Sequence, residues 1–231
     1  MADSSSTRVL AEHARPSLGS SHGAIYQMVA TALAARDIRG ERFVDVGCGG
    51  GQLRAFVNDR FDRYIGVDGV RYDDFPSDAE FHELDLDHGR VPLPDGTADV
   101  AAAVETIEHL ENPRALAREL VRLAKPGGWI VLTTPNQRSL LSLLTLVTKG
   151  SFSAFQDPDY PAHITALLEI DFARIGAELG LVDAGFAYSH HGRLPFSAAH
   201  YPTSVSALFP RALSDNLLYI ARRGPVEQGF R

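Results

Sequence analysis

The chain has 231 residues, of which 45% are hydrophobic and 22% charged, enough for one α/β domain with a full buried core. Its net charge of −7 excludes a general polyanion binder, so we expect no nucleic-acid partner. The single cysteine, Cys48, excludes an intrachain disulfide and a cysteine-based zinc cage. We expect a flexible stretch at residues 1–21. Its polar start, and the lack of an apolar run long enough for a membrane span, predict a cytoplasmic protein.

Strand-like and helix-like segments alternate along the chain, which is typical of a mostly parallel sheet with helices on both faces. His22 to Arg36 predicts an amphipathic helix over the ligand side. Gln52 to Asn58 predicts a second helix, and Asn112 with Pro113 starts a third that Lys125 to Gly128 end. Seven short apolar runs predict the strands, at residues 43–46, 64–67, 81–84, 100–104, 129–133, 182–188 and 217–221.

The turn after the first strand is rich in glycine. Asp45 lies inside the strand, and Gly47, Gly49 and Gly51 follow it. Because glycine has no Cβ atom, a ligand can lie against the backbone of such a loop. The order D-x-G-x-G-x-G differs from the dinucleotide fingerprint G-x-G-x-x-G, so we do not expect a dinucleotide.

Acidic residues also end the next two strands, at the sheet edge where parallel sheets bind ligands. Asp68 ends the second strand, where a carboxylate can accept hydrogen bonds from both hydroxyls of a ribose. Asp85 ends the third strand. Its carboxylate and the backbone N–H of Leu86 can contact the amino group and a ring nitrogen of adenine, and Asp87 is a close substitute for Asp85.

An E-x-x-E-H motif follows the fourth strand and contains Glu105, Glu108 and His109. If this segment forms a helical turn, the three side chains share one face. Two carboxylates and an imidazole suit a divalent cation, and His163 is a candidate fourth ligand. Carboxylates favour Mg²⁺ and imidazoles favour Zn²⁺ or Mn²⁺, so the ligand types leave the metal open.

Six segments in order resemble the class I S-adenosylmethionine-dependent methyltransferases: residues 44–51, 66–68, 93–100, 108–110, 123–128 and 134–136. The resemblance implies an α/β, Rossmann-like fold with a seven-stranded sheet whose last strand is antiparallel. It implies S-adenosylmethionine as the cofactor, with the glycine loop and Asp45 at its methionine part. Asp68 is then expected at the ribose and Asp85 with Leu86 at the adenine, while Glu105 is a further expected cofactor contact.

The E-x-x-E-H motif with a later histidine resembles the ubiquinone-biosynthesis O-methyltransferases and the small-RNA 2′-O-methyltransferases, where such residues hold a divalent metal. The net charge of −7 disfavours a resemblance to the small-RNA methyltransferases. So does Leu110, which follows His109 where a second adjacent histidine would be expected. Two interpretations of the expected catalytic pair, Glu108 and His109, stay open. In one, a metal such as Mg²⁺ binds Glu105, Glu108, His109 and His163. In the other, the pocket is metal-free and His109 acts as a base or orders the site.

Residues 137–165 and 193–211 are expected to be insertions on the substrate side. A leucine-rich helix, Leu140 to Val147, is expected as a lid packed on the sheet. If this helix instead has a function, it lines a pocket for a lipophilic acceptor or makes a peripheral membrane contact. The sequence thus predicts O-methylation of a small or lipophilic acceptor. The alternatives are a cofactor-binding module or partner subunit without catalysis and an NAD-dependent dehydrogenase, which the glycine order opposes.

Overall fold

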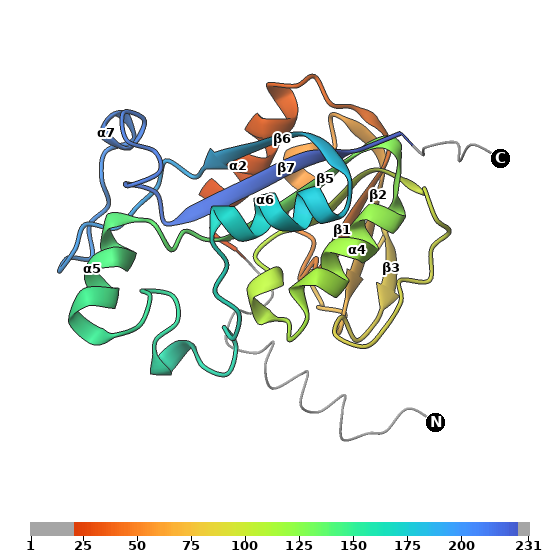
Figure 1. Ribbon diagram of the computed structural model, residues 1–231. Helices are drawn as coiled ribbons and strands as arrows, with labels where there is room; N and C mark the ends of the chain where they lie inside the picture. The colour runs from red at the N-terminus through yellow and green to blue at the C-terminus, as the bar shows by residue number, and fades with distance from the viewer. Residues whose placement is uncertain (1–20, 226–231) are drawn as a thin grey trace.

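The computed structural model describes residues 21–225, so the expected flexible stretch at residues 1–21 lies outside the described residues except for Ser21. Seven strands form one sheet, which confirms the seven predicted strands (Figure 1). They are β1 Gly40–Val46, β2 Phe61–Asp68, β3 Glu80–Glu83, β4 Ala98–Ala103, β5 Ala124–Pro135, β6 Leu181–Tyr188 and β7 Asn216–Arg223.

The strand order is β3-β2-β1-β4-β5-β7-β6. Strands β1 to β5 pair in parallel, whereas β7 is antiparallel to both β5 and β6. The predicted Rossmann-like fold with an antiparallel last strand is therefore confirmed. Because the parallel strands share one direction, their carboxyl ends meet at one edge of the sheet, where such folds bind ligands.

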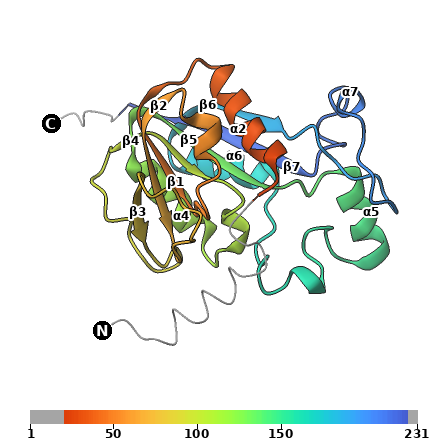
Figure 2. The same cartoon turned by 180° about the vertical axis from the view of Figure 1, so that it is seen from behind.

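Helices cover both faces of the sheet (Figures 1 and 2). Helices α4 Pro113–Leu123 and α6 Glu169–Glu178 pack on one face through Leu120 and Phe172, which are fully buried. Helices α2 Gly23–Ala34 and α3 Arg54–Val57 pack on the other through Leu33 and Val57. Burial of each such side chain stabilises the fold by about 1.5–3 kcal/mol. The remaining helical segments are α5 Leu140–Lys149, α7 Thr203–Ser206 and the 3₁₀ turns η2 Ile107–His109 and η3 Asp157–Asp159.

The start of α4 matches the sequence prediction, but the start of β5 does not. The Asn112 side chain accepts the Ala115 N–H at 3.0 Å and caps the helix. The predicted strand start at residue 129 is wrong, because β5 begins at Ala124, which pairs with Ala98 directly after the helix ends. The expected turn at 125–128 is a bulge within β5, where Gly127 has a φ of 78°.

Helix α5 forms as predicted, but it does not pack as a lid on the sheet. It lies with α7 at one end of the molecule, beyond the layered core (Figures 1 and 2). Its buried side chains are Ser142 and Thr145, while Leu140 and Leu143 are 40% and 44% exposed. The Ser142 hydroxyl accepts the Ser153 N–H, so α5 folds back on its own following loop. Among residues 21–225, no helix is long and apolar enough to cross a membrane.

Candidate functional site

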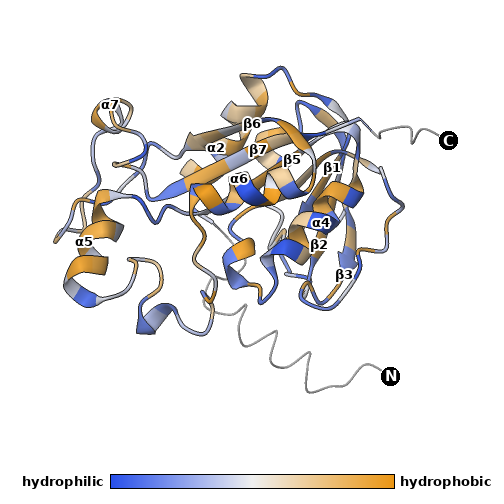
Figure 3. Cartoon of the chain, viewed as in Figure 1, coloured by the Kyte–Doolittle hydropathy of each residue, from blue (hydrophilic) through white to orange (hydrophobic). Residues whose placement is uncertain are grey.

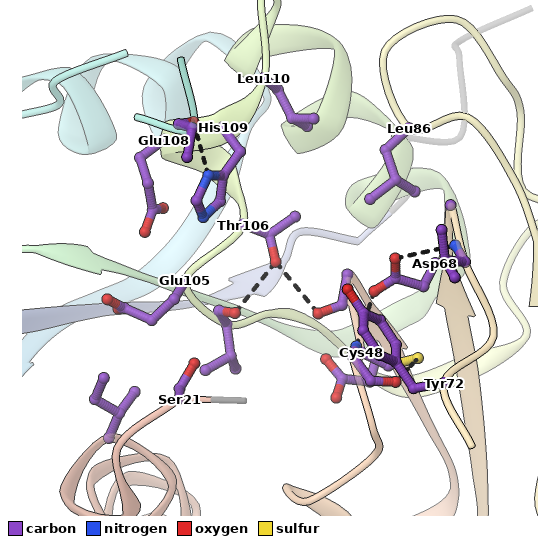
Figure 4. A pocket seen from close by; sticks show the side chains of 18 of the residues that line it. Ser21, Cys48, Asp68, Tyr72, Leu86, Glu105, Thr106, Glu108, His109 and Leu110 are labelled. Atoms are coloured by element: carbon purple, nitrogen blue, oxygen red, sulfur yellow. Dashed lines mark hydrogen bonds between the residues drawn. The ribbon is translucent and has the colours of Figure 1, made fainter. Parts of the chain in front are cut away.

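A cavity of about 390 Å³ opens at the carboxyl ends of β1, β2 and β4 (Figure 4). Most of the site residues predicted from the sequence line it. They are Asp45, Gly47, Gly49, Asp68, Leu86, Glu105, Glu108, His109 and His163. Gly51 and Asp85 are not part of the lining. Segments far apart in the sequence thus meet at the predicted edge of the sheet.

The glycine loop needs glycine for two separate reasons. Gly47 has a φ of 79°, and a Cβ atom there would lie 2.2 Å from the Oγ1 atom of Thr106. Any side chain at this position would displace Thr106 from the cavity wall. Gly51, with a φ of 75°, is not part of the lining, and a Cβ atom there would approach Pro76 at 2.8 Å. Gly47 therefore shapes the cavity, whereas Gly51 shapes the turn.

Asp45 has a buried carboxylate, and only one of its two oxygens accepts a hydrogen bond from a described residue. Its Oδ2 accepts a hydrogen bond of 2.5 Å from the Tyr64 hydroxyl, and its Oδ1 has no hydrogen-bond partner among the described residues. Burial raises the pKa of Asp45 to about 7, with the Tyr64 hydrogen bond opposing and Asp68 adding to the shift. An unpaired buried carboxylate oxygen at a cavity wall fits a cationic group of a ligand.

Asp68 connects the end of β2 to the glycine loop that follows β1. Its Oδ2 accepts the Gly49 N–H at 2.8 Å, so the carboxylate ties the glycine loop to the end of β2. Burial raises the pKa of Asp68, while the backbone hydrogen bond from Gly49 lowers it. A carboxylate has about four lone-pair sites, so Asp68 can still accept hydrogen bonds from ligand hydroxyls.

The acid at the third strand end turns away from the cavity. Asp85 accepts the Asp87 N–H at 3.0 Å and contacts the His88 ring at 3.1 Å, so its side chain closes its own turn. Leu86 and Asp87 line the cavity instead. The strand position predicted an acid here, and the local turn places Asp87, rather than Asp85, at the wall.

Glu105 lines the same cavity as the other two members of its motif, and burial together with the charge of Glu108 raises its pKa, but it does not share a helical face with them. It has a φ of 50°, so the 3₁₀ turn begins only at Ile107 and the expected shared helical face does not form. The Thr133 hydroxyl accepts the Glu105 N–H at 2.9 Å and donates to its Oε1 at 2.8 Å. The Asn216 amide donates to Oε2 at 2.7 Å. Nothing in the local sequence indicated Thr133 or Asn216 as its partners.

Glu108, His109 and His163 converge, with one potential ligand atom from each lying within 4.8 Å of the others. Glu108 is completely buried, and neither carboxylate oxygen has a hydrogen-bond partner among the described residues. Burial raises the pKa of Glu108, and the nearby Thr134 hydroxyl, which itself has no hydrogen-bond partner among the described residues, lowers it. A buried carboxylate with two unpaired oxygens is costly unless a cation occupies the space beside it.

Both imidazoles are oriented by backbone carbonyls. The Nδ1 atom of His109 lies 2.8 Å from the Ala162 carbonyl oxygen, and Nδ1 of His163 lies 2.5 Å from that of Ala154. Because a carbonyl only accepts, each Nδ1 carries the proton, and in the neutral ring the lone pair is on Nε2. The backbone carbonyl of Glu105 also acts on the His109 ring and raises its pKa, against the larger effect of burial. Burial lowers the pKa of both rings, which favours their neutral form. Metal-binding histidines typically use this arrangement, so the three residues fit a divalent cation.

The sequence did not single out several other lining residues. Ile25 and Tyr26 lie in α2, and Ser21 and His22 directly precede it; all but Ser21 belong to the segment expected to cover this side. The Tyr26 hydroxyl accepts the Ser21 N–H at 2.8 Å. Thr106 lies inside the E-x-x-E-H motif, and Tyr72 follows β2 (Figure 4). None of residues 193–211 lines this cavity.

Comparison with known families agrees with this geometry. A family model described as a methyltransferase domain matches residues 23–183. The chain belongs to this methyltransferase family. It is a S-adenosylmethionine-dependent methyltransferase, with the glycine order and fold of that enzyme class. Family membership also sets aside the dehydrogenase alternative.

Two relatives of the methyltransferase come from bacteria. A protein of Mycolicibacterium smegmatis named "Probable S-adenosylmethionine-dependent methyltransferase" is 33% identical over 209 residues, covering 84% of this chain and 71% of the relative. A ubiquinone biosynthesis O-methyltransferase of Chromobacterium violaceum is 31% identical over 120 residues. That match covers 48% of this chain and 51% of the relative, so it spans about half the length of each protein.

Solved structures support the fold of the methyltransferase. A S-adenosylmethionine-dependent methyltransferase from Archaeoglobus fulgidus superposes with a TM-score of 0.61 at 20% identity, covering 85% of this chain and 94% of that one. The [4+2]-cyclase SpnF superposes with a TM-score of 0.55 at 19% identity, covering 86% and 81%. Because one of these neighbours is named as a cyclase, the likeness shows the fold and leaves the acceptor chemistry to the site.

Proposed function

We propose that this methyltransferase methylates a hydroxyl oxygen of a small or lipophilic acceptor, assisted by a divalent cation at Glu108, His109 and His163. The observation that carries the proposal is the buried Glu108 carboxylate, whose two oxygens have no partner among the described residues. Relatives named ubiquinone biosynthesis O-methyltransferase support oxygen as the methylated atom.

The cavity offers a fitting group for each part of S-adenosylmethionine, which when bound supplies an electrophilic methyl group. The unpaired Oδ1 of Asp45 suits the amino group of its methionine part. Asp68 suits the ribose hydroxyls, and Leu86 with Asp87 lies where the adenine is expected. Gly47 lets the ligand approach the loop backbone. These residues bind and orient, which is the main requirement of an in-line methyl transfer.

A hydroxyl acceptor must also lose its proton. A divalent cation at the three-residue site would lower the pKa of such a hydroxyl. With the cation bound, Glu108 would contribute the negative charge, and the hydrogen bonds to Ala162 and Ala154 orient the two imidazoles through their Nδ1 atoms. Ala162 and His163 line the cavity, which supports the proposal that segment 137–165 lies on the acceptor side.

Turnover with isotope-labelled cofactor tests the proposed function. We expect S-adenosylhomocysteine to form with phenols or catechols, faster with those that carry an apolar tail, and mass spectrometry to place the methyl group on oxygen. A product methylated on nitrogen or carbon would contradict the proposal. Turnover without any acceptor sets the background.

The affinity for S-adenosylhomocysteine is expected to depend on pH through Asp45. Below its pKa of about 7, the carboxyl is protonated and cannot pair with the ligand's amino group. The affinity should rise up to tenfold per pH unit as the pH approaches 7 from below, and it should level off above that value. Asp45→Asn should bind more weakly and lose this dependence, as measured by calorimetry from pH 6 to pH 8.

The unliganded protein gives a check on the sign of this effect. Burial raises the pKa of Asp45 in the folded state, so the folded state binds more protons than the unfolded state between the ordinary carboxyl pKa and about 7. The free energy of unfolding therefore falls as pH rises through this range, and Asp45→Asn should reduce that fall. Asp62→Asn, at an exposed position of β2, is the matched control.

The affinity for S-adenosylhomocysteine decides the role of Asp45. A wild-type affinity that does not change with pH would remove Asp45 from the proposed role.

A further inference from the structure

Asp45 and Tyr64 form a buried polar pair in an apolar part of the core. Tyr64 of β2 lies beside Phe43 of β1, since the two residues pair across the parallel strands and their rings stack with centroids 6.0 Å apart. The Phe75 ring lies 6.4 Å from the same tyrosine. Figure 3 shows hydrophobic colouring along much of the central strands of the sheet. A phenylalanine would fill this space as well as a tyrosine, so packing alone does not explain the Tyr64 hydroxyl.

The register of the sheet brings this hydroxyl to Asp45. Asp45 lies two residues beyond Phe43 on β1, and side chains two residues apart point to the same face of a sheet. Tyr64 sits opposite Phe43, so its side chain reaches the Asp45 carboxylate diagonally and donates to Oδ2 at 2.5 Å. The hydroxyl therefore fixes one oxygen of the carboxylate and leaves the other, Oδ1, without a partner among the described residues.

The charge of Asp45 depends on this contact. Burial raises the pKa of Asp45 to about 7, and the Tyr64 hydrogen bond opposes the effect of burial. Without the hydroxyl, the pKa of Asp45 would rise further, because the charged form would lose a donor. Tyr64 keeps its own proton in this range, since burial and the nearby Asp45 raise the pKa of its hydroxyl well above the ordinary value.

Other titratable groups face Asp45 from the neighbouring elements. Asp68, at the end of β2, adds to the rise in the pKa of Asp45 through its charge. Cys48 of the glycine loop and Tyr26 of α2 also interact with Asp45, and burial raises the pKa of both, so they stay neutral near pH 7. On the side of β4, Asp45 pairs with Ala102, which does not titrate. These neighbours leave the tyrosine hydroxyl of β2 as the group that favours the charged form of Asp45.

We propose that Tyr64 is a positioning residue for cofactor binding: its hydroxyl holds the Asp45 carboxylate in place and charged, so that Oδ1 pairs with the amino group of the cofactor's methionine part. This inference rests on the proposed function, which assigns Asp45 to that amino group. Hydrogen bonds between charged partners are roughly twice as strong as neutral ones, so the charged carboxylate is the form that binds well. The hydroxyl thereby sets the pH above which the cofactor binds with full affinity.

The pH dependence of the affinity for S-adenosylhomocysteine tests this role. Calorimetry compares the wild type with Tyr64→Phe, which keeps the ring and removes only the hydroxyl. The variant should bind about tenfold more weakly at pH 6 and within about twofold of the wild type at pH 8, because loss of the hydrogen bond moves the pH dependence upward by about one pH unit. A merely structural role would lower the affinity by the same factor at every pH.

A second ligand and a control variant separate this effect from a general loss of packing. 5′-Methylthioadenosine keeps the adenosine part and lacks the amino group, so at each pH its affinity should be the same for the wild type and Tyr64→Phe. Tyr219→Phe is the matched control, since Tyr219 is a buried tyrosine of β7 whose ring lies beside Phe172 and Phe186. It should bind S-adenosylhomocysteine like the wild type at both pH values.

The double variant Asp45→Asn with Tyr64→Phe tests whether the tyrosine acts through the acid. It should bind S-adenosylhomocysteine like Asp45→Asn alone, because without the carboxylate the hydroxyl has no charge to hold. A further loss in the double variant would overturn the proposal. Equal weakening of Tyr64→Phe at pH 6 and pH 8, or unchanged affinity at both, would overturn it as well. A thermal melt of each variant shows that it is folded.

A failure of this inference can be told apart from a failure of the proposed function. If the wild type shows the predicted pH dependence and Tyr64→Phe shares it unchanged, the inference fails while Asp45 keeps its proposed role. A wild-type affinity that does not change with pH would contradict both. Binding is measured without turnover, so the identity of the methylated atom does not affect the result.

Discussion

Replacing Asp68 with alanine should lower the affinity of the methyltransferase for S-adenosylhomocysteine about 100-fold, because the ribose hydroxyls lose a buried charged acceptor. The same change frees the Gly49 N–H that Asp68 accepts, so the glycine loop also loses its tie to β2. Calorimetry measures the affinity, and a thermal melt of the unliganded variant shows that it is folded.

Asp62→Ala is the control for Asp68→Ala, because Asp62 is an exposed acid on the same strand. It should bind S-adenosylhomocysteine like the wild type. Asp68→Asn, which keeps the shape of the side chain and one acceptor oxygen, should lie between the two. An Asp68→Ala variant with unchanged affinity would show that this carboxylate does not contact the ribose.

Glu108→Gln should reduce turnover by about 10²–10⁴-fold while leaving the affinity for S-adenosylhomocysteine within about twofold of the wild type. The substitution keeps the size of the side chain and removes the negative charge on which the proposed cation site depends. Both oxygens of Glu108 lack a hydrogen-bond partner among the described residues, so the change disturbs at most the contact with the nearby Thr134 hydroxyl. Initial rates under saturating cofactor, together with calorimetry, separate the loss of chemistry from a loss of binding.

Glu111→Gln is the matched control for Glu108→Gln, since Glu111 is exposed three residues further along the chain. It should keep full turnover. Full turnover of Glu108→Gln would mean that this carboxylate has no part in the reaction, and His109 would then remain as the residue that takes the proton.

Apolar runs predicted where the strands lie, and Asn112 predicted the start of α4, whereas the antiparallel last strand followed from the family resemblance. The start of β5 was predicted too late, since pairing of Ala124 with Ala98 depends on a strand some 26 residues earlier. Helix α5 was predicted correctly from its leucines, but its burial was not. The spacing of its leucines indicates a helix, but this spacing cannot show whether another element covers the apolar side of the helix.

The sequence predicted most acidic residues of the candidate site, but not the residues that form hydrogen bonds with them. Asp45 could be found from its place before the glycine loop, and Asp68 from its place at the end of β2. The choice between Asp85 and Asp87 depends on which side chain closes the local turn. Glu105 departs from the expected helical turn because Thr133 and Asn216 hold it, and Asn216 lies 111 residues away in the sequence. Such distant partners come from the strand order, which the motif itself does not contain.

Removal and return of divalent metal tests the central claim most directly. The purified wild-type protein is treated with a chelator, and methylation of its best phenol or catechol acceptor is then followed with labelled cofactor. We predict that turnover is lost while binding of S-adenosylhomocysteine persists, and that Mg²⁺, Mn²⁺ or Zn²⁺ restores turnover in the wild type but not in Glu108→Gln. Turnover that resists the chelator would contradict a metal-assisted reaction at Glu108, His109 and His163.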